Sequence, residues 1–291
     1  MSLSITHFDS DGIISAYLIN KYVERTKRVM FSNANKIKDT IARSLIEEWE
    51  IEKLYILDIS GNEKAFRVAS VYNNVIWIDH HEWTVECKYK NIEITLSNDF
   101  SAASVISKKY GISDRLVEIA DHLDQNTPKN EVEEGFRDLI SSIRNLQNRD
   151  REKIAESLVF SMLNTDIEEI IEKNKNYIIN FRNEMEKIKE KLKSEIVRKK
   201  INNINLIFIK TDKNIPVYKI QEMLEENWDI LIVLYSKNYF WKIEFRSKDL
   251  NILPLAIIYG GGGHKKAAGA SLYENPDINE ILKLVETIYK N

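Results

Sequence analysis

Apolar runs separated by helix-like stretches determine the fold of the first hundred residues. "YIL" (55–57) and "VIWI" (75–78) contain no polar residue, which is typical of strands covered on both faces. A chain that alternates strands and helices in this way forms a parallel sheet with crossover helices. The expected strands are "SLSITHFD", 28–32, "KLYILDIS", "NVIWIDHH" and 92–96, and the expected helices are 12–24, 36–50 and 63–71.

Polar clusters follow three of these strands, at the point where each strand ends. In an open α/β sheet, the carboxyl ends of the strands meet along one edge, where ligands bind. We therefore expect the polar side chains to lie together. They are His7, Asp9 and Asp11 after the first strand, Asp58 after the third, and Asp79, His80 and His81 after the fourth.

Carboxylates mixed with imidazole suit Mn²⁺ or Mg²⁺ better than a structural zinc ion. Asp58 is expected to bridge two ions roughly 3.5–4 Å apart, with His80 on the second ion, and such a pair promotes phosphoester hydrolysis. His81 is expected to orient a ligand or to contact a phosphate. A further carboxylate comes from "VEIADHLDQ", where Asp121 is the candidate and Asp124 its rival. For any single aspartate, the alternative is a helix cap or a turn.

The middle of the chain is expected to be helical, and its end to form a second α/β unit. No glycine or proline lies between Gly135 and Pro216, and an apolar stripe from Ile178 to Ile196 has helical spacing. Lys and Arg outnumber Glu over 171–200. The helix could therefore attract a polyanion, which is an alternative to a role as a structural spacer. The second unit is expected to contain strands at 204–210, "DILIVLYS" and "FWKIEFRS", and helices at 217–225 and 277–290.

The segment "YGGGGHKKAAGAS" holds five of the nine glycines of the chain. Successive glycines let backbone N–H groups surround an anion, which favours a phosphate- or nucleotide-binding loop over a merely flexible turn. Arg246 and Ser247, at the end of "WKIEF", are further candidates for phosphate contact, although a solvated charge is an equal reading of Arg246. The residues expected in the loop are Gly261, Gly262, Gly263, His264 and Lys265.

The composition narrows the class of protein. The chain contains 43% hydrophobic and 30% charged residues. It has no apolar run long enough to span a bilayer and no signal-peptide layout, so we expect a cytoplasmic protein with no membrane partner. The single Cys87 excludes an internal disulfide and a cysteine-rich zinc site. The net charge of −3 means that any polyanion site must be local.

The motifs "THFDSDG", "LYILDIS", "IDHH", "IAD" and "GGGGHKKAAG" occur in this order. Together they resemble the DHH phosphoesterases with an associated C-terminal domain of the DHHA1 type, the group of RecJ-type exonucleases and nano-RNases, including archaeal members. The resemblance covers nearly the whole chain. It implies an α/β protein with an active site in a cleft between its domains, divided into a DHH catalytic domain at 1–165, a connecting helix at 166–202 and a substrate-binding domain at 203–291.

The resemblance also implies roles for individual residues. Two Mn²⁺ ions, with Mg²⁺ or Co²⁺ as alternatives, are expected on His7, Asp9, Asp11, Asp58, His80 and Asp121. Asp79, His80 and His81 are the expected catalytic residues. Gly261 to Gly263, His264 and Arg246 are expected at the substrate.

The sequence is compatible with three functions. The first is a manganese-dependent exonuclease that degrades single-stranded RNA, DNA or short oligonucleotides to mononucleotides. The second is hydrolysis of a small phosphate compound such as 3′-phosphoadenosine phosphate or a cyclic dinucleotide. The third is a RecJ-like binding partner of replication or repair proteins. Related enzymes include dimers, so a homodimer is an open expectation.

Overall fold

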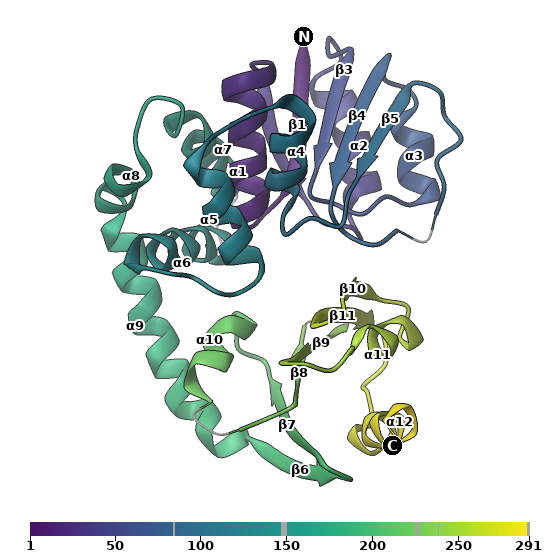
Figure 1. Ribbon diagram of the computed structural model, residues 1–291, viewed down its shortest axis with the longest axis vertical. Coiled ribbons are helices and arrows are strands. Elements are labelled where there is room, and N and C mark those ends of the chain that lie inside the picture. Colours follow the sequence, from purple (N-terminus) through teal and green to yellow (C-terminus); the bar gives the residue numbers. More distant parts are fainter. Residues whose placement is uncertain (84, 147–149, 225–226, 238, 290–291) are drawn as a thin grey trace. The chain divides into compact units, whose positions relative to one another are not determined.

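The computed structural model describes residues 1–83, 85–146, 150–224, 227–237 and 239–289 (Figure 1). The chain divides into two compact units, Met1–Phe181 and Arg182–Asn291. The division falls within helix α9 (Lys175–Leu192).

The N-terminal unit contains a five-stranded parallel sheet in the order β2-β1-β3-β4-β5. The expected parallel α/β fold is therefore confirmed, and each expected strand is present. Their bounds are β1 Ser2–His7, β2 Arg28–Ser32, β3 Lys53–Leu57, β4 Asn74–Asp79 and β5 Ile92–Leu96.

Helices cover both faces of this sheet, which explains why its strands have continuous apolar runs. One face carries α2 (Ile37–Glu47) and α3 (Glu63–Ala69), which pack with Leu54 and Trp77. Helices α1 (Ser10–Leu18) and α4 (Ala102–Tyr110) belong to the core of the other face. That core continues into the helical part of the unit, made of α5 Arg115–Asp124, α6 Glu131–Asn145, α7 Arg151–Ser161 and α8 Ile167–Lys173.

The connecting segment differs from the single helix expected at 166–202. Helices α8 and α9 replace it, and α9 ends at Leu192. Residues Val197–Ile201 then form strand β6, paired antiparallel with β7 (Ile204–Thr211). The apolar stripe is real as far as Leu192, which is fully buried, but tertiary pairing with β7 overrides helical spacing beyond it.

The C-terminal unit is a six-stranded mixed sheet in the order β10-β11-β9-β8-β7-β6. Its remaining strands are β8 Ile230–Ser236, β9 Trp241–Ser247, β10 Gly262–His264 and β11 Ala267–Leu272, and its helices are α10 Val217–Met223, α11 Leu253–Ile258 and α12 Ile278–Ile288. The side chains of α11 and α12 pack with alternate residues of the strands, including Ile243 and Phe245 of β9.

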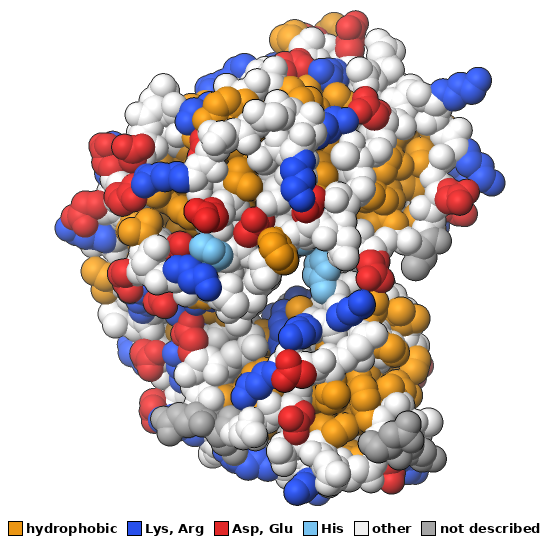
Figure 2. Space-filling model, viewed as in Figure 1, with side chains coloured by type: hydrophobic (Ala, Val, Ile, Leu, Met, Phe, Trp, Pro, Cys, Tyr) orange, Lys and Arg blue, Asp and Glu red, His pale blue; other side chains and the backbone are white. Residues whose placement is uncertain are grey.

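Among the described helices, none combines the length and the apolar character that crossing a bilayer requires. The face shown in Figure 2 mixes acidic and basic side chains, in line with the small net charge.

Candidate metal centre and active site

The expected polar residues lie at the carboxyl ends of β1, β3 and β4, which are neighbours in the sheet. In the order β2-β1-β3-β4-β5, the strand that follows β1 in sequence lies on one side of it, whereas the strand that follows β3 lies on the opposite side. The strand order therefore reverses between β1 and β3, and ligands bind at such a switch point. Asp9 caps helix α1 directly after β1, and its carboxylate accepts the Gly12 N–H at 3.0 Å. Asp58 follows β3, and Asp79 ends β4.

Asp58 lies at the centre of the cluster. Its backbone has φ 57°, a left-handed conformation that Asp tolerates better than most residues but that still costs energy. The side chain is 2% exposed, and its Oδ2 has no hydrogen-bond partner among the residues that the structure describes. Oδ2 lies 3.6 Å from His7 Nδ1, whereas Oδ1 lies 3.5 Å from His80 Nε2. The two carboxylate oxygens therefore face two different groups of side chains.

These two groups each have the composition of a metal site. His7, Asp9 and Asp58 have ligand atoms within 4.8 Å of one another, and so do Asp11, His80 and Asp124. His80 Nε2 lies 3.7 Å from Asp11 Oδ2 and 3.8 Å from Asp124 Oδ2. These residues come from the ends of three strands and from two helices, and only folding brings them together.

Helix α4 positions Asp11. The Asp11 carboxylate accepts the N–H groups of Ala102 at 2.7 Å and Ala103 at 2.9 Å, both in the first turn of α4. The N-terminus of a helix stabilises a carboxylate, and two directed hydrogen bonds fix its orientation.

Asp79 positions the histidines that follow it. Its side chain is fully buried and accepts hydrogen bonds from the backbone N–H of His80 and from Trp83 Nε1 at 2.6 Å. His81 Nδ1 lies 2.7 Å from the same carboxylate. Burial alone raises the pKa of a carboxyl group, but His81 and these hydrogen bonds outweigh it and lower the pKa of Asp79. Asp79 therefore acts as the orienting partner of His81.

The structure separates the two rival aspartates of α5. Asp124 lies in the cluster with Asp11 and His80. The Asp121 carboxylate instead accepts hydrogen bonds from the hydroxyls of Ser101 and Ser104, the latter at 2.7 Å. Asp121, the residue expected as a ligand, thus ties α5 to the start of α4. Ser101, which caps α4 and donates its hydroxyl to Asp121, is the sequence signal that distinguishes the two aspartates.

The electrostatics of the cluster fit a divalent cation. Burial opposes a charged His80, yet Asp58 and Asp11 outweigh it and raise its pKa to about 10. Burial and the nearby Asp58 raise the pKa of Asp11. Asp124 lies at the exposed edge of the cluster, where desolvation by the surrounding protein, partly offset by His80, raises its pKa to about 7. Buried carboxylates are stable only when a positive charge compensates them. Oxygen donors with two imidazoles and an unbonded buried Asp58 Oδ2 are a donor set for Mn²⁺ or Mg²⁺.

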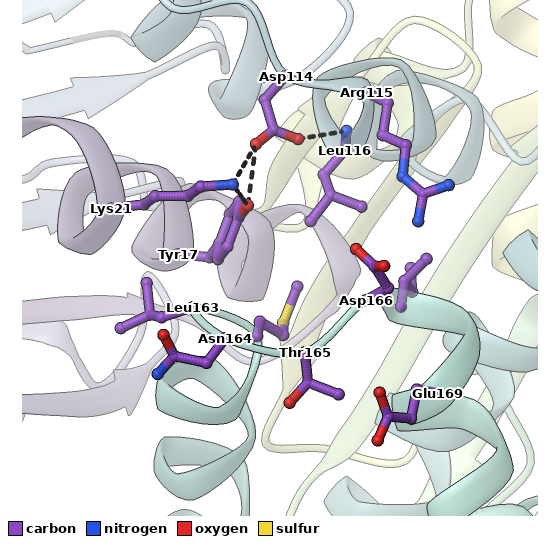
Figure 3. Close-up of a pocket in the computed structure, with 12 residues that line it drawn as sticks. Tyr17, Lys21, Asp114, Arg115, Leu116, Leu163, Asn164, Thr165, Asp166 and Glu169 are labelled. Atoms are coloured by element: carbon purple, nitrogen blue, oxygen red, sulfur yellow. Dashed lines mark hydrogen bonds and ion pairs between the residues drawn. The ribbon is translucent and has the colours of Figure 1, made fainter.

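A separate polar cavity of about 420 Å³ lies beside α1, α5 and α8 (Figure 3). Asp114, the N-cap of α5, accepts hydrogen bonds there from Leu116 N–H and from the hydroxyls of Tyr17 and Tyr22, and Lys21 Nζ lies 3.3 Å away. Burial would raise the pKa of Asp114, but these partners lower it. The network joins α5, which carries Asp124, to the helix that carries Asp11.

The glycine segment of the C-terminal unit is a hairpin rather than a loop. Gly262–His264 form β10, antiparallel to β11. Gly263 has φ 134°, and a Cβ on Gly261 would lie 2.1 Å from the carbonyl oxygen of Gly269. Close strand packing therefore accounts for these two glycines. The fold brings Arg246 of β9 opposite Ala267 of β11, three residues after His264.

The other expected substrate residues of this unit have local partners. Arg246 donates to Glu244 Oε2 at 2.9 Å and to the carbonyl of Phe245. Ser247 Oγ accepts the Leu250 N–H and closes a turn. The Lys265 carbonyl accepts the Ile252 N–H.

The comparisons with known proteins agree with this arrangement. Residues 186–291 match the DHHA1 domain. The fold of the chain is similar to that of a pGpG-specific phosphodiesterase from Vibrio cholerae, with a TM-score of 0.59, 16% identity and coverage of 99% of this chain and 97% of that one. The match over residues 186–291 identifies a DHHA1 domain in the C-terminal part of the chain, in agreement with the expected resemblance to DHH phosphoesterases that carry such a domain. A second structure with a similar fold, exonuclease RecJ bound to manganese, has a TM-score of 0.52, 12% identity and coverage of 99% of this chain and 89% of that one.

One curated relative matches the chain at higher identity over a short stretch. It is the bifunctional oligoribonuclease and PAP phosphatase of Mycoplasma pneumoniae, 43% identical over 48 residues. The match covers 16% of this chain and 14% of the relative's length. The names of these relatives are those of phosphoesterases and nucleases.

Proposed function

We propose that the chain is a divalent-metal-dependent phosphodiesterase that hydrolyses short single-stranded oligonucleotides to mononucleotides. The observation that carries the proposal is the placement of Asp58, whose two oxygens face the His7 and Asp9 group on one side and His80 on the other. A carboxylate in this position suits a bridge between two cations. The exonuclease structure bound to manganese supports Mn²⁺ as the ion to test first.

The proposed reaction requires different roles of different residues. The residues that would hold divalent cations are His7, Asp9, Asp11, Asp58, His80 and Asp124. When bound, such cations would supply Lewis acidity for hydrolysis of a phosphodiester. Asp79 holds the His81 ring in one orientation, so that His81 contacts a phosphate oxygen of the substrate. The DHHA1 domain binds the remainder of the substrate through Arg246 and His264.

A labelled-oligonucleotide assay tests the proposal. The purified chain with Mn²⁺ is incubated with RNA and DNA oligonucleotides labelled at either end, and the product ladder reports substrate, polarity and processivity. We expect mononucleotide release that stops on chelation and in Asp58→Asn. The matched control is Asp212→Asn, an exposed aspartate of the other unit, which should behave as wild type. Hydrolysis that survives in Asp58→Asn would contradict the proposal.

A small phosphate compound is the second candidate substrate. Two relatives favour it, because one is named a PAP phosphatase and the other a pGpG-specific phosphodiesterase. Rates on 3′-phosphoadenosine phosphate and on pGpG, measured beside two- to five-nucleotide RNAs, separate the two candidates. Faster turnover of either small compound than of the pentanucleotide would replace the first candidate by the second.

A further inference from the structure

One end of the C-terminal sheet exposes aromatic and basic side chains together. Tyr239 is 90% exposed, Tyr273 is 89% exposed and Phe240 is 37% exposed. Lys237 and Lys242 flank Tyr239 and Phe240 in the sequence. We call these five residues the aromatic–lysine patch.

The strand register places residues of the patch at the same end of neighbouring strands. Lys237 N–H donates to the Phe240 carbonyl where β8 turns into β9. Trp241 lies opposite Leu272 of β11, so Phe240 and Tyr273, the next residue on each side, lie at the same end of neighbouring strands. Residues far apart in sequence therefore meet at this end of the sheet.

Lys242 of the patch shares a sheet face with Arg246. Ile243 and Phe245 of β9 point into the core, and alternation places Lys242, Glu244 and Arg246 on the opposite face. At about 3.4 Å per residue, Arg246 and Phe240 are about 20 Å apart along the strand. On β11, the row beside them contains small residues, Ala267 and Gly269.

The charge of the patch is positive. Lys242 pairs with Glu244 at 2.5 Å, and Glu244 also binds Arg246, so one carboxylate serves two cations. Lys237 lies 5.4 Å from the Tyr235 ring centre, and burial together with repulsion from Lys242 lowers its pKa. A bound anion would relieve this repulsion.

From these observations we infer that the aromatic–lysine patch binds the bases and phosphates of a single-stranded oligonucleotide whose end is held at Arg246. Exposed aromatic rings stack on bases of any identity, and lysines beside them neutralise the phosphates. This inference rests on the proposed function. A stacked strand rises about 3.4 Å per nucleotide, so a span of about 20 Å requires about six nucleotides and excludes a dinucleotide.

Binding and hydrolysis of two substrate lengths test the inference. In the Asp58→Asn background, which prevents cleavage, we expect Tyr273→Ala to weaken the Kd of a fluorescent octanucleotide about tenfold, because one stacking ring is lost. Tyr273→Phe should retain wild-type affinity. Lys242→Gln should reduce the slope of log affinity against log salt by about 0.7. The matched control is Trp49→Ala, since Trp49 is 80% exposed but lies in the other unit.

In the otherwise wild-type chain, Tyr273→Ala should lower kcat/KM for the octanucleotide about tenfold and leave that for a dinucleotide unchanged. Unchanged octanucleotide affinity in Tyr273→Ala, or equal loss on both lengths, would overturn the inference. Failure of the wild type to hydrolyse any oligonucleotide would sink the proposed function instead, and the binding measurement would still decide the role of the patch.

Discussion

The two units place their functional residues in opposite ways. In the N-terminal unit, the ends of parallel strands bring carboxylates and imidazoles into a buried cluster, where Asp11, Asp58 and His80 are almost inaccessible to solvent. In the C-terminal unit, Arg246 and Lys242 lie on a partly open strand face and share one carboxylate, Glu244. Buried groups are held rigidly and suit chemistry on one bond, whereas an exposed face suits binding of a long ligand through many weak contacts. Substitutions in the first unit should therefore lower activity more than substitutions in the second.

Asp58→Asn should produce the largest loss of activity. Removing the carboxylate shared by the two groups should lower kcat roughly 10³-fold, which corresponds to about 4 kcal/mol. Asn keeps the left-handed backbone, so the fold should survive, as circular dichroism would show. A loss of activity no larger than that of Arg246→Gln would contradict the expected difference between the two units.

The same substitution should change stability in opposite directions with and without metal. With EDTA, Asp58→Asn should unfold at a higher temperature than wild type, because one buried like charge is removed. With Mn²⁺, the wild type should be the more stable, because it alone gains the binding free energy. Thermal scans in both conditions provide the measurement. A wild type that Mn²⁺ fails to stabilise would argue against a metal centre.

Asp124→Asn and Asp121→Asn test which of the two aspartates of α5 belongs to the metal site. Loss of Asp124 should lower activity roughly 100-fold and weaken Mn²⁺ binding, whereas loss of Asp121, which orients neighbours, should cost about tenfold. Titration with Mn²⁺ provides a readout that a general loss of stability would not reproduce. The reverse order of effects would make Asp121 the ligand.

Arg246→Gln should act mainly on substrate binding. Loss of a charge-assisted contact to phosphate should raise KM about tenfold and change kcat little. Arg67→Gln, an exposed arginine of α3, is the matched control. An effect on kcat alone would place Arg246 in the chemical step rather than in binding.

Asp114→Asn should have the smallest effect on activity and a measurable effect on stability. Its network holds α5 on α1, and its loss should cost about 2 kcal/mol of unfolding free energy at pH 7. The pKa of Asp114 is lowered from 3.8 on folding, so the stabilisation is present above that pH and disappears as pH falls below it. Urea unfolding at several pH values measures this. A difference between variant and wild type that grows toward low pH would contradict it.

Local patterns predicted the N-terminal sheet well. The runs at 55–57 and 75–78 form β3 and β4, and the polar residues at their ends meet as expected, because parallel strands all end at one edge. The patterns failed where pairing between distant segments decides the structure. Residues 197–201 belong to the connecting helix expected at 166–202, but they pair with β7. Part of the glycine run forms β10, because β11 lies against it.

The sequence by itself determined the type of sheet and the residues that gather at its edge, since both follow from short-range periodicity and from the chemistry of strand ends. Only the tertiary structure decided which of Asp121 and Asp124 joins the cluster, because the choice depends on where Ser101 and Ser104 of α4 meet α5. The meeting of Tyr273 with Phe240 was likewise decided by the register between β9 and β11, which spacing along the chain does not encode.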